Sequence, residues 1–281
     1  MKLCLGIEST AHTFGASVVT FDGDILSNER KLFTTESGGL IPVKVGEHHT
    51  KICDEIIQEA LRVAGKKITD IDLIAFSQSP GMGHSLRIGA TAARSLAVHH
   101  DIPLIGVNHC IAHLEIGRLK AFNPKKPGAR CEDPILLYAS GANTQVIGYE
   151  GKKYRVFGET LDNGIGNFLD GFARKLDLGF PGGPKIEQLA VQGKNFIELP
   201  YVVKGMDVSF GGIGTKLEQL HKTGKYTKED LCFSTQETVF AMLLEVAERA
   251  LAHTGKTQLV LGGGVACNKR LQEMAMLMCE E

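Results

Sequence analysis

The chain has 281 residues, enough for one large domain or for two lobes of about 130 residues each. Its 43% hydrophobic and 22% charged residues can fill a core and exclude a disordered protein. Because the net charge is only −1, any RNA footprint must be a local patch or come from another subunit.

Seven scattered cysteines without a CxxC pair favour reduced thiols over a disulfide framework. The N-terminus lacks the apolar stretch of a signal peptide. No run approaches the roughly 20 apolar residues that span a bilayer. We therefore expect a cytoplasmic protein that does not contact membranes.

The first part of the chain predicts three strands followed by alternating helices and strands. Apolar stretches and the turn Asp22-Gly23-Asp24 indicate the opening strands, and helical periodicity follows. The predicted strands are 2–7, 16–21, 25–32, 73–76 and 104–107, and the predicted helices are 44–64, 85–99 and 109–120.

The same order of elements then restarts after 121–134, a segment rich in proline and mixed charge that predicts a linker. The glycine-rich stretch 179–228 is expected to be an irregular insertion. The predicted strands of this part are 135–139, 145–149, 153–160 and 258–261, and the predicted helices are 164–176, 234–253 and 268–279.

This repetition predicts an α/β fold with two ribonuclease-H-like lobes, the actin/Hsp70/sugar-kinase (ASKHA) architecture, and a nucleotide cleft between them. The lobes are predicted at 1–120 and 135–281, separated by the linker 121–134. The second lobe contains the insertion near 179–228.

Turns with small or hydroxyl residues follow the first strand of each half. They are Glu8-Ser9-Thr10 and Ser140-Gly141-Ala142-Asn143-Thr144. Backbone N–H groups in such turns can converge on phosphate oxygens. Either turn alone fits an ordinary hairpin better, but their equivalent positions favour phosphate binding.

Glycines also mark two predicted strand-to-helix or turn-to-helix junctions. Three successive glycines open the run Gly262–Asn268 after a buried strand, where bare backbone can approach a nucleotide. The run is not the GxGxxG of a Rossmann fold. Pro181-Gly182-Gly183-Pro184 predicts a similar turn into a helix.

Polar side chains suggest two further sites. Glu159, Asp162 and Asp170 surround a strand-to-helix junction, where carboxylates can hold ribose or a hydrated cation; helix capping by Asp162 or Asn163 is the alternative. His109 and His113 lie four residues apart at the start of a predicted helix, as a metal site requires. Alone, that pair is more often incidental.

Eight ordered motifs resemble the universal tRNA threonylcarbamoyladenosine transferase family over essentially the whole chain. Ala11-His12-Thr13 and Tyr138 are typical of its archaeal form, which is similar to the catalytic subunit of the KEOPS complex. The motifs are GIESTAHTFG, SPGMGHSLRIG, GVNHCIAHLEIG, YASGANTQVI, GETLDNGIGNFLD, GGPKIE, KGMDVSF and GGGVACN.

The resemblance implies transfer of a threonylcarbamoyl group from threonylcarbamoyl-AMP to adenine 37 of tRNA. It implies one iron or zinc ion on His109, His113 and Tyr138, and catalytic roles for Glu8, His109 and His113. An adenine nucleotide (threonylcarbamoyl-AMP, ATP or AMP) is expected at Tyr138, Ser140, Gly141, Asn143, Asp162, Gly166, Glu187, Gly263 and Asn268.

Several positions depart from the family pattern. Ala142 replaces a glycine of the usual SGGNT loop, which we expect to crowd backbone approach to a phosphate. Ser79 and Gly211 are exchanges between small residues. The family pattern also continues to a DNG motif with an aspartate metal ligand, whereas this sequence ends at Glu281. The metal site is therefore expected to be incomplete.

Two other activities fit parts of the sequence. A zinc metallopeptidase would use His109 and His113, but the glutamate of an HExxH motif is missing between them. An ATP-dependent phosphotransferase or ATPase of the same fold explains the glycine turns and leaves both histidines without a role. A non-enzymatic scaffold does not explain the clustered polar residues.

The partners implied by the resemblance are tRNA and KEOPS subunits, including a protein-kinase-like subunit and a small dimerising subunit. The basic cluster noted in the sequence is Lys120, Lys125, Lys126 and Arg130. About four cations predict only weak tRNA attachment by this chain alone. Other subunits are expected to dock on 44–64 or 85–99.

Overall fold

The computed structural model describes residues 1–34, 41–119 and 131–280. The chain forms two compact units, Met1–Ala112 with Leu119–Ala129, and His113–Arg118 with Arg130–Glu281. Most of the predicted linker 121–134, and the basic cluster Lys120, Lys125, Lys126 and Arg130, lie outside the described residues. Among the described helices, none is long and apolar enough to cross a membrane.

The first unit contains a five-stranded sheet in the order β3-β2-β1-β4-β5. The central strand β1 pairs antiparallel with β2 and parallel with β4, and β4 pairs parallel with β5. The strands are β1 (Leu3–Glu8), β2 (Thr13–Thr20), β3 (Ile25–Leu32), β4 (Leu73–Ser79) and β5 (Leu104–Asn108).

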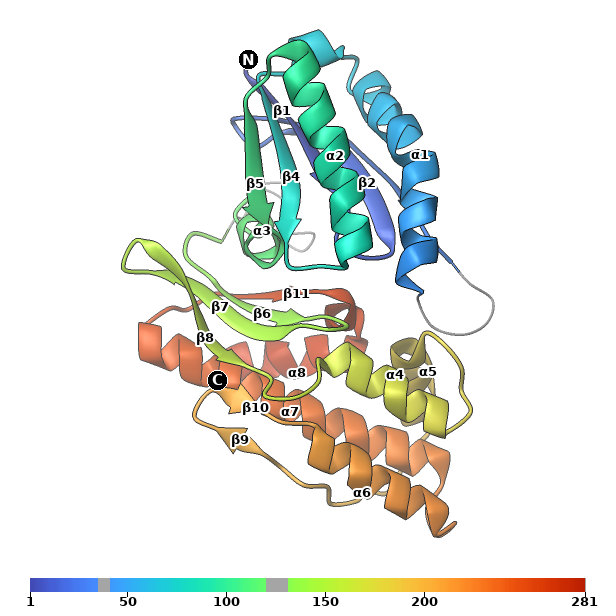
Figure 1. Cartoon of the computed structure of the whole chain (residues 1–281). Helices are drawn as coiled ribbons and strands as arrows, with labels where there is room; N and C mark the ends of the chain where they lie inside the picture. The colour runs from blue at the N-terminus through green and yellow to red at the C-terminus, as the bar shows by residue number, and fades with distance from the viewer. Residues whose placement is uncertain (35–40, 120–130, 281) are drawn as a thin grey trace. The chain divides into compact units, whose positions relative to one another are not determined.

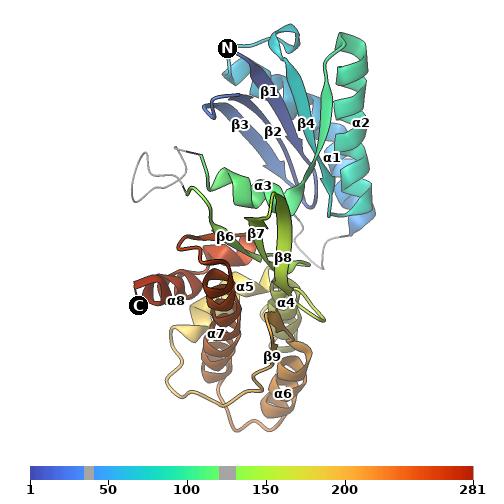
Figure 2. The same cartoon turned by 90° about the vertical axis from the view of Figure 1, so that its left-hand side faces the viewer.

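Two long helices, α1 (Pro42–Val63) and α2 (Gly83–His100), cover one face of this sheet (Figures 1 and 2). Alternate residues of β1 and β2 point to them, so Leu5 and Phe14 are fully buried. Burial of such side chains contributes about 1.5–3 kcal/mol each. The unit also contains a short 3-10 turn, Ile68–Asp70, and the first half of α3 (His109–Ile116).

The second unit repeats the first four positions of that sheet order. Its four-stranded sheet has the order β11-β6-β7-β8, in which β6 pairs antiparallel with β7 and parallel with β11. The role of β6 is therefore that of β1. The strands are β6 (Ile135–Ala139), β7 (Thr144–Glu150), β8 (Lys153–Glu159) and β11 (Leu259–Gly262).

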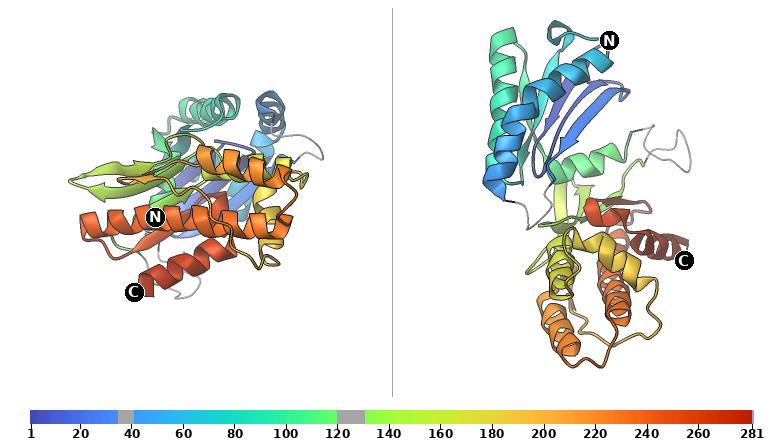
Figure 3. Two further views of the ribbon diagram at one scale, coloured as in Figure 1. Left: turned by 90° about the horizontal axis from the view of Figure 1, so that it is seen from below. Right: turned by 90° about the vertical axis from the view of Figure 1, so that its right-hand side faces the viewer.

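The core of the second unit lies between this sheet and its helices, with the long α7 (Lys228–Thr254) beneath the sheet (Figures 1 and 3). Fifteen of its 27 residues are buried, so α7 is enclosed on most sides. Its neighbours are α4 (Ile165–Lys175), α5 (Gly182–Ala190), α6 (Gly211–Lys222) and α8 (Lys269–Glu280).

The prediction that 179–228 is irregular was wrong. This stretch contains α5 and α6 and a two-stranded ribbon, β9 (Val203–Lys204) with β10 (Asp207–Val208). The glycines that suggested irregularity, such as Gly182 and Gly211, lie in the first turns of the two helices. First-turn N–H groups have no partner within the helix, so bare backbone there is easily bonded from outside.

Both sheets place a hairpin-connected strand pair beside a parallel strand reached through a helix. The strand order of the first four positions is the same in both sheets. The predicted α/β class with duplicated ribonuclease-H-like units is therefore confirmed by the strand orders of the two sheets.

Candidate functional site

The turns after β1 and β6 are structurally equivalent, as the sequence predicted. Each turn is approached by a glycine from the segment that follows the neighbouring parallel strand. A β-carbon at Gly81 would lie 2.7 Å from the carbonyl oxygen of Thr10, and one at Gly263 would lie 2.3 Å from that of Ala139. Both glycines therefore permit close packing of two backbone segments.

In the first unit, Glu8, Thr10 and His109 form a connected polar cluster. The Glu8 Oε2 atom lies 3.2 Å from Nδ1 of His109, and Oε1 accepts a 2.7 Å bond from the Thr10 N–H and another from its hydroxyl. Burial alone would raise the pKa of Glu8. The bonds and charge of His109, with the bonds from Thr10, outweigh burial and lower this pKa, so Glu8 is a carboxylate.

His49 supports the same turn and was not recognised in the sequence. It is fully buried on α1, its Nε2 lies 2.9 Å from the carbonyl oxygen of Ala11, and its ring contacts Phe14 edge-on. Burial lowers the pKa of His49, so its neutral form is favoured. Since α1 and the turn are far apart in sequence, no local pattern marks this contact.

His109 and His113 lie one helical turn apart on α3, within which the division between the two units falls. The His113 ring is 4.9 Å from the ring of Tyr138, which is only 3% exposed at the end of β6. Of the three predicted metal ligands, His113 and Tyr138 thus lie together in the second unit. His109 contacts Glu8 in the first unit.

The predicted metal ligands fit a metal site in one respect, the orientation of the His109 imidazole. A carboxylate on one imidazole nitrogen, as between Glu8 and His109, orients metal-ligating histidines and sets their tautomer. No group of three His, Cys, Asp or Glu side chains suited to a metal occurs among the residues described. The donors that α3 and β6 supply are therefore two imidazoles and a phenol.

The turn Ser140–Asn143 is held by backbone contacts that leave its outer side accessible. The Ser140 N–H donates to the Asn143 carbonyl at 2.9 Å, and the Ser140 carbonyl accepts from the Gly166 N–H at 3.0 Å. A β-carbon at Gly166 would lie 2.7 Å from Cα of Gly141. Gly141 and Ala142 are exposed, and the chain does not adopt a positive φ at Ala142.

Two predicted nucleotide ligands make structural contacts at the start of α8. Asn268 is 8% exposed; its Oδ1 accepts from the Arg270 and Leu271 N–H groups, and its Nδ2 donates to Gln236. The Glu187 Oε1 atom accepts a 2.7 Å bond from the Lys269 N–H. Asn268 and Glu187 therefore cap the helix that follows the glycine run.

The acidic residues near α4 also bind backbone. Asp162 accepts 2.7 Å bonds from the N–H groups of Asn163 and Gly211, and a 2.6 Å bond from the Ser209 hydroxyl. Asp170 accepts a 2.7 Å bond from the Gly182 N–H. Capping thus occurs, but at the starts of α6 and α5 and not, as considered from the sequence, at α4.

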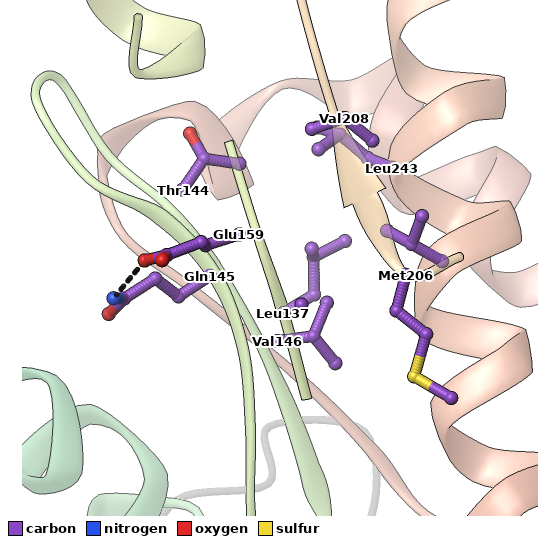
Figure 4. Close-up of a pocket in the computed structure, with 10 residues that line it drawn as sticks. Leu137, Thr144, Gln145, Val146, Glu159, Met206, Val208 and Leu243 are labelled. Atoms are coloured by element: carbon purple, nitrogen blue, oxygen red, sulfur yellow. Dashed lines mark hydrogen bonds between the residues drawn. The ribbon is translucent and has the colours of Figure 1, made fainter. Parts of the chain in front are cut away.

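Glu159 points along the sheet surface toward Gln145, whose Nε2 donates to it at 3.2 Å (Figure 4). Its backbone N–H donates to the Asp207 carboxylate at 2.9 Å. Beneath Glu159, apolar side chains of β6, β7, β10 and α7, including Leu137 and Leu243, line a narrow interior space. Glu159 thus lies on the ladder between β7 and β8, apart from the Ser140–Asn143 backbone contacts.

Replacement of Asp162 by alanine is expected to destabilise the chain by about 1–2 kcal/mol, because the start of α6 loses its cap. Burial alone would raise the pKa of Asp162, but its hydrogen bonds outweigh burial and lower that pKa to about 2. The contribution of Asp162 is therefore complete above about pH 4 and is lost as pH falls toward 2. Urea unfolding of both proteins from pH 2 to 7 checks this, and a pH-independent difference would contradict it.

The strand orders and the glycine-supported turns define the duplicated ribonuclease-H-like class. Solved structures agree on the fold: HypF of Thermococcus kodakarensis aligns with 100% of the chain and 44% of its own at TM-score 0.71 and 15% identity. Component A of the (R)-2-hydroxyglutaryl-CoA dehydratase of Acidaminococcus fermentans aligns with 99% of the chain and 88% of its own at TM-score 0.56 and 14% identity.

The family comparison is specific. Residues 24–281 match the family described as tRNA N6-adenosine threonylcarbamoyltransferase. Proteins of that name from Thermococcus kodakarensis and Thermococcus sibiricus are each 55% identical over 99% of this chain and 83% of their own. The chain therefore belongs to the tRNA N6-adenosine threonylcarbamoyltransferase family, and it is a tRNA-modifying transferase.

Proposed function

We propose that the chain transfers a threonylcarbamoyl group from threonylcarbamoyl-AMP to N6 of adenine 37 in tRNA. The observation that supports this most is the accessible Ser140–Asn143 turn, which Gly166 and Gly263 support from behind. The same turn would also suit an ATP-dependent phosphotransferase, and it is the family match over residues 24–281 that favours the transferase. No contact described above favours the metallopeptidase.

The adenylate part of the donor is proposed to bind on the Ser140–Asn143 turn. Backbone N–H groups of such turns stabilise phosphate oxygens without moving during the reaction. Since Asp162, Glu187 and Asn268 already accept or donate several bonds within the protein, their proposed role is to hold the backbone around the nucleotide. The direct contacts are assigned to Ser140, Gly141 and Asn143.

We also propose that His109, His113 and Tyr138 hold one iron or zinc ion. Such a metal, when bound, supplies a Lewis acid that polarises a carbonyl group. Glu8 orients the His109 imidazole, and the ring contact of Tyr138 with His113 fixes the second imidazole. In this scheme Glu8 is a positioning residue.

The proposed assembly is of the KEOPS type, with a protein-kinase-like subunit and a small dimerising subunit in the cytoplasm. Exposed apolar side chains on α1 and α2 support docking there: Val43, Val63 and Val98 are 51%, 45% and 85% exposed. Two curated archaeal relatives, from Methanocaldococcus jannaschii and Methanothermobacter thermautotrophicus, are named as probable bifunctional threonylcarbamoyladenosine biosynthesis proteins and are about twice as long as this chain.

AMP is expected to raise the melting temperature, because a ligand present at 100 times its Kd stabilises the folded state by about 2.7 kcal/mol. Asn143→Ala should reduce this increase, whereas Asn28→Ala on β3 of the first unit should leave it unchanged. Thermal unfolding with and without AMP measures both. Transfer of threonylcarbamoyl to tRNA by the chain with its partner subunits tests the reaction itself, and no transfer would sink the proposed function.

A further inference from the structure

The hairpin between β7 and β8 has basic residues at its tip, and they have no role in the proposed reaction. Its two central turn residues, Gly151 and Lys152, have φ of 59° and 64°, as a type I′ turn requires. Lys152, Lys153 and Arg155 are all exposed, whereas Glu150 is the one acidic residue of the segment 149–157. Within the described residues, neither lysine takes part in an ion pair.

A recess of about 490 Å³ lies beside this hairpin, against the C-terminal end of α7. Arg155 and Glu150 line it together with the Phe157 ring, Met206 and His253. The ring centroids of Phe157 and His253 are 6.0 Å apart, and the rings meet edge-on at 66°. The Arg155 Nε donates to the Glu150 carbonyl at 3.4 Å.

The hairpin is held in place by its own aromatic side chains. Tyr149 and Tyr154 lie on opposite strands with their rings 5.0 Å apart, and the Tyr154 hydroxyl donates to Glu115 on α3 at 3.0 Å. Such cross-strand aromatic pairs stabilise a hairpin. The basic tip and the recess therefore belong to one ordered surface.

Cations, an aromatic ring and a thioether around a recess of this size suit a planar base that carries phosphates. Pockets of about 300–1,000 Å³ bind small molecules or single nucleotides. Proteins recognise RNA mainly through unpaired bases that stack on aromatic rings, with Lys and Arg on the neighbouring phosphates. A paired duplex has no base to place in such a recess.

We propose that this surface binds an unpaired nucleotide of the tRNA substrate, with its base against Phe157 and His253. Its flanking phosphates contact Lys152, Lys153 and Arg155. The inference rests on the proposed function, because it assigns to the RNA substrate a contact surface outside the Ser140–Asn143 turn. It also locates a basic patch that lies within the described residues, unlike the cluster noted in the sequence.

The phosphate contacts are tested with Lys153→Ala/Arg155→Ala and labelled tRNA in a titration over salt. We expect affinity about tenfold lower at low salt and a log–log salt slope smaller by about 1.4, since each single-strand contact contributes about 0.7. The control Lys216→Ala/Lys225→Ala removes two exposed lysines from the same unit and should bind as wild type. Equal losses in both double variants, or none in the first, overturn the inference.

The base contact is tested with Phe157→Leu, which keeps an apolar side chain against the core, and with the exposed His253→Ala. Each should weaken tRNA binding about fivefold and leave the affinity for a fully paired RNA duplex unchanged, because only the unpaired base loses a stacking partner. An equal change on tRNA and duplex contradicts base capture. Circular dichroism confirms that each variant is folded.

tRNA binding and threonylcarbamoyl transfer are measured separately, so that failure of the proposed RNA surface can be told apart from failure of the proposed reaction. If the double variant binds tRNA as wild type does, the RNA surface is wrong, whatever the transfer assay gives. If the wild-type assembly fails to modify tRNA while the variants still weaken binding selectively, the RNA surface stands as a binding site and the proposed reaction is wrong.

Discussion

Gly263→Ala is expected to destabilise the chain by roughly 3–5 kcal/mol, a large fraction of the stability of an ordinary domain. Gly263 has φ 89° and ψ 168°, a backbone region that is essentially restricted to glycine. In addition, the new β-carbon would lie 2.3 Å from the Ala139 carbonyl oxygen, which is backbone of the central strand β6. Neither the new β-carbon nor the Ala139 carbonyl oxygen can move away without shifting the Ser140–Asn143 turn.

The neighbouring Gly264→Ala provides the matched control. No atom lies within 4 Å of the position that its β-carbon would take, and its φ is not positive. Urea unfolding should therefore show a large loss for Gly263→Ala and a change within about 0.5 kcal/mol for Gly264→Ala. Similar stability of the two variants would contradict the close packing of the glycine run on β6.

This contrast also separates the roles of the three successive glycines. Gly262 permits the approach of Leu136 and His113, and Gly263 permits the approach of Ala139, whereas Gly264 faces open space. The sequence marks a place of close backbone approach but does not say which glycine is approached. That depends on the path of β6, which is more than 100 residues earlier in the chain.

The sheets were predictable because their strands carry strong local signals. Alternate apolar residues in β1 and β2, and continuous apolar residues in β6, appear in the sequence at nearly the bounds that the structure has. Helix ends were harder. α7 begins at Lys228 and not at 234, because Thr227 accepts a bond from the Asp230 N–H and caps the helix.

The site was predictable only in part, for a physical reason. The glycine turns and the HxxxH pair are local patterns, so the sequence displays them. Asp162 and His49 bind segments distant in sequence, and so does the amide nitrogen of Asn268, so these contacts follow from which groups the fold brings near. The Asn268 oxygen, in contrast, caps its own helix through local N–H groups. A polar residue beside a glycine turn therefore fits capping and ligand binding equally well until its contacts are known.

Glu8→Gln is expected to lower metal affinity, and transfer with it, by roughly 10–100-fold, the usual effect of losing a residue that orients a metal-bound histidine. The amide oxygen can still accept the bond from the Thr10 N–H, so the turn after β1 keeps its shape. The negative charge 3.2 Å from Nδ1 of His109 is lost, and the imidazole is oriented less firmly.

Glu55→Gln serves as the control for Glu8→Gln, because it removes one carboxylate from the same unit at an exposed ion pair with Lys31. Competition for zinc between each protein and a chelator measures metal affinity, and thermal unfolding shows whether the variants remain folded. Metal affinity should fall in Glu8→Gln and stay at the wild-type value in Glu55→Gln. If Glu8→Gln binds zinc as tightly as the control, the carboxylate does not position His109 for a metal, and its bond to the imidazole only stabilises the turn.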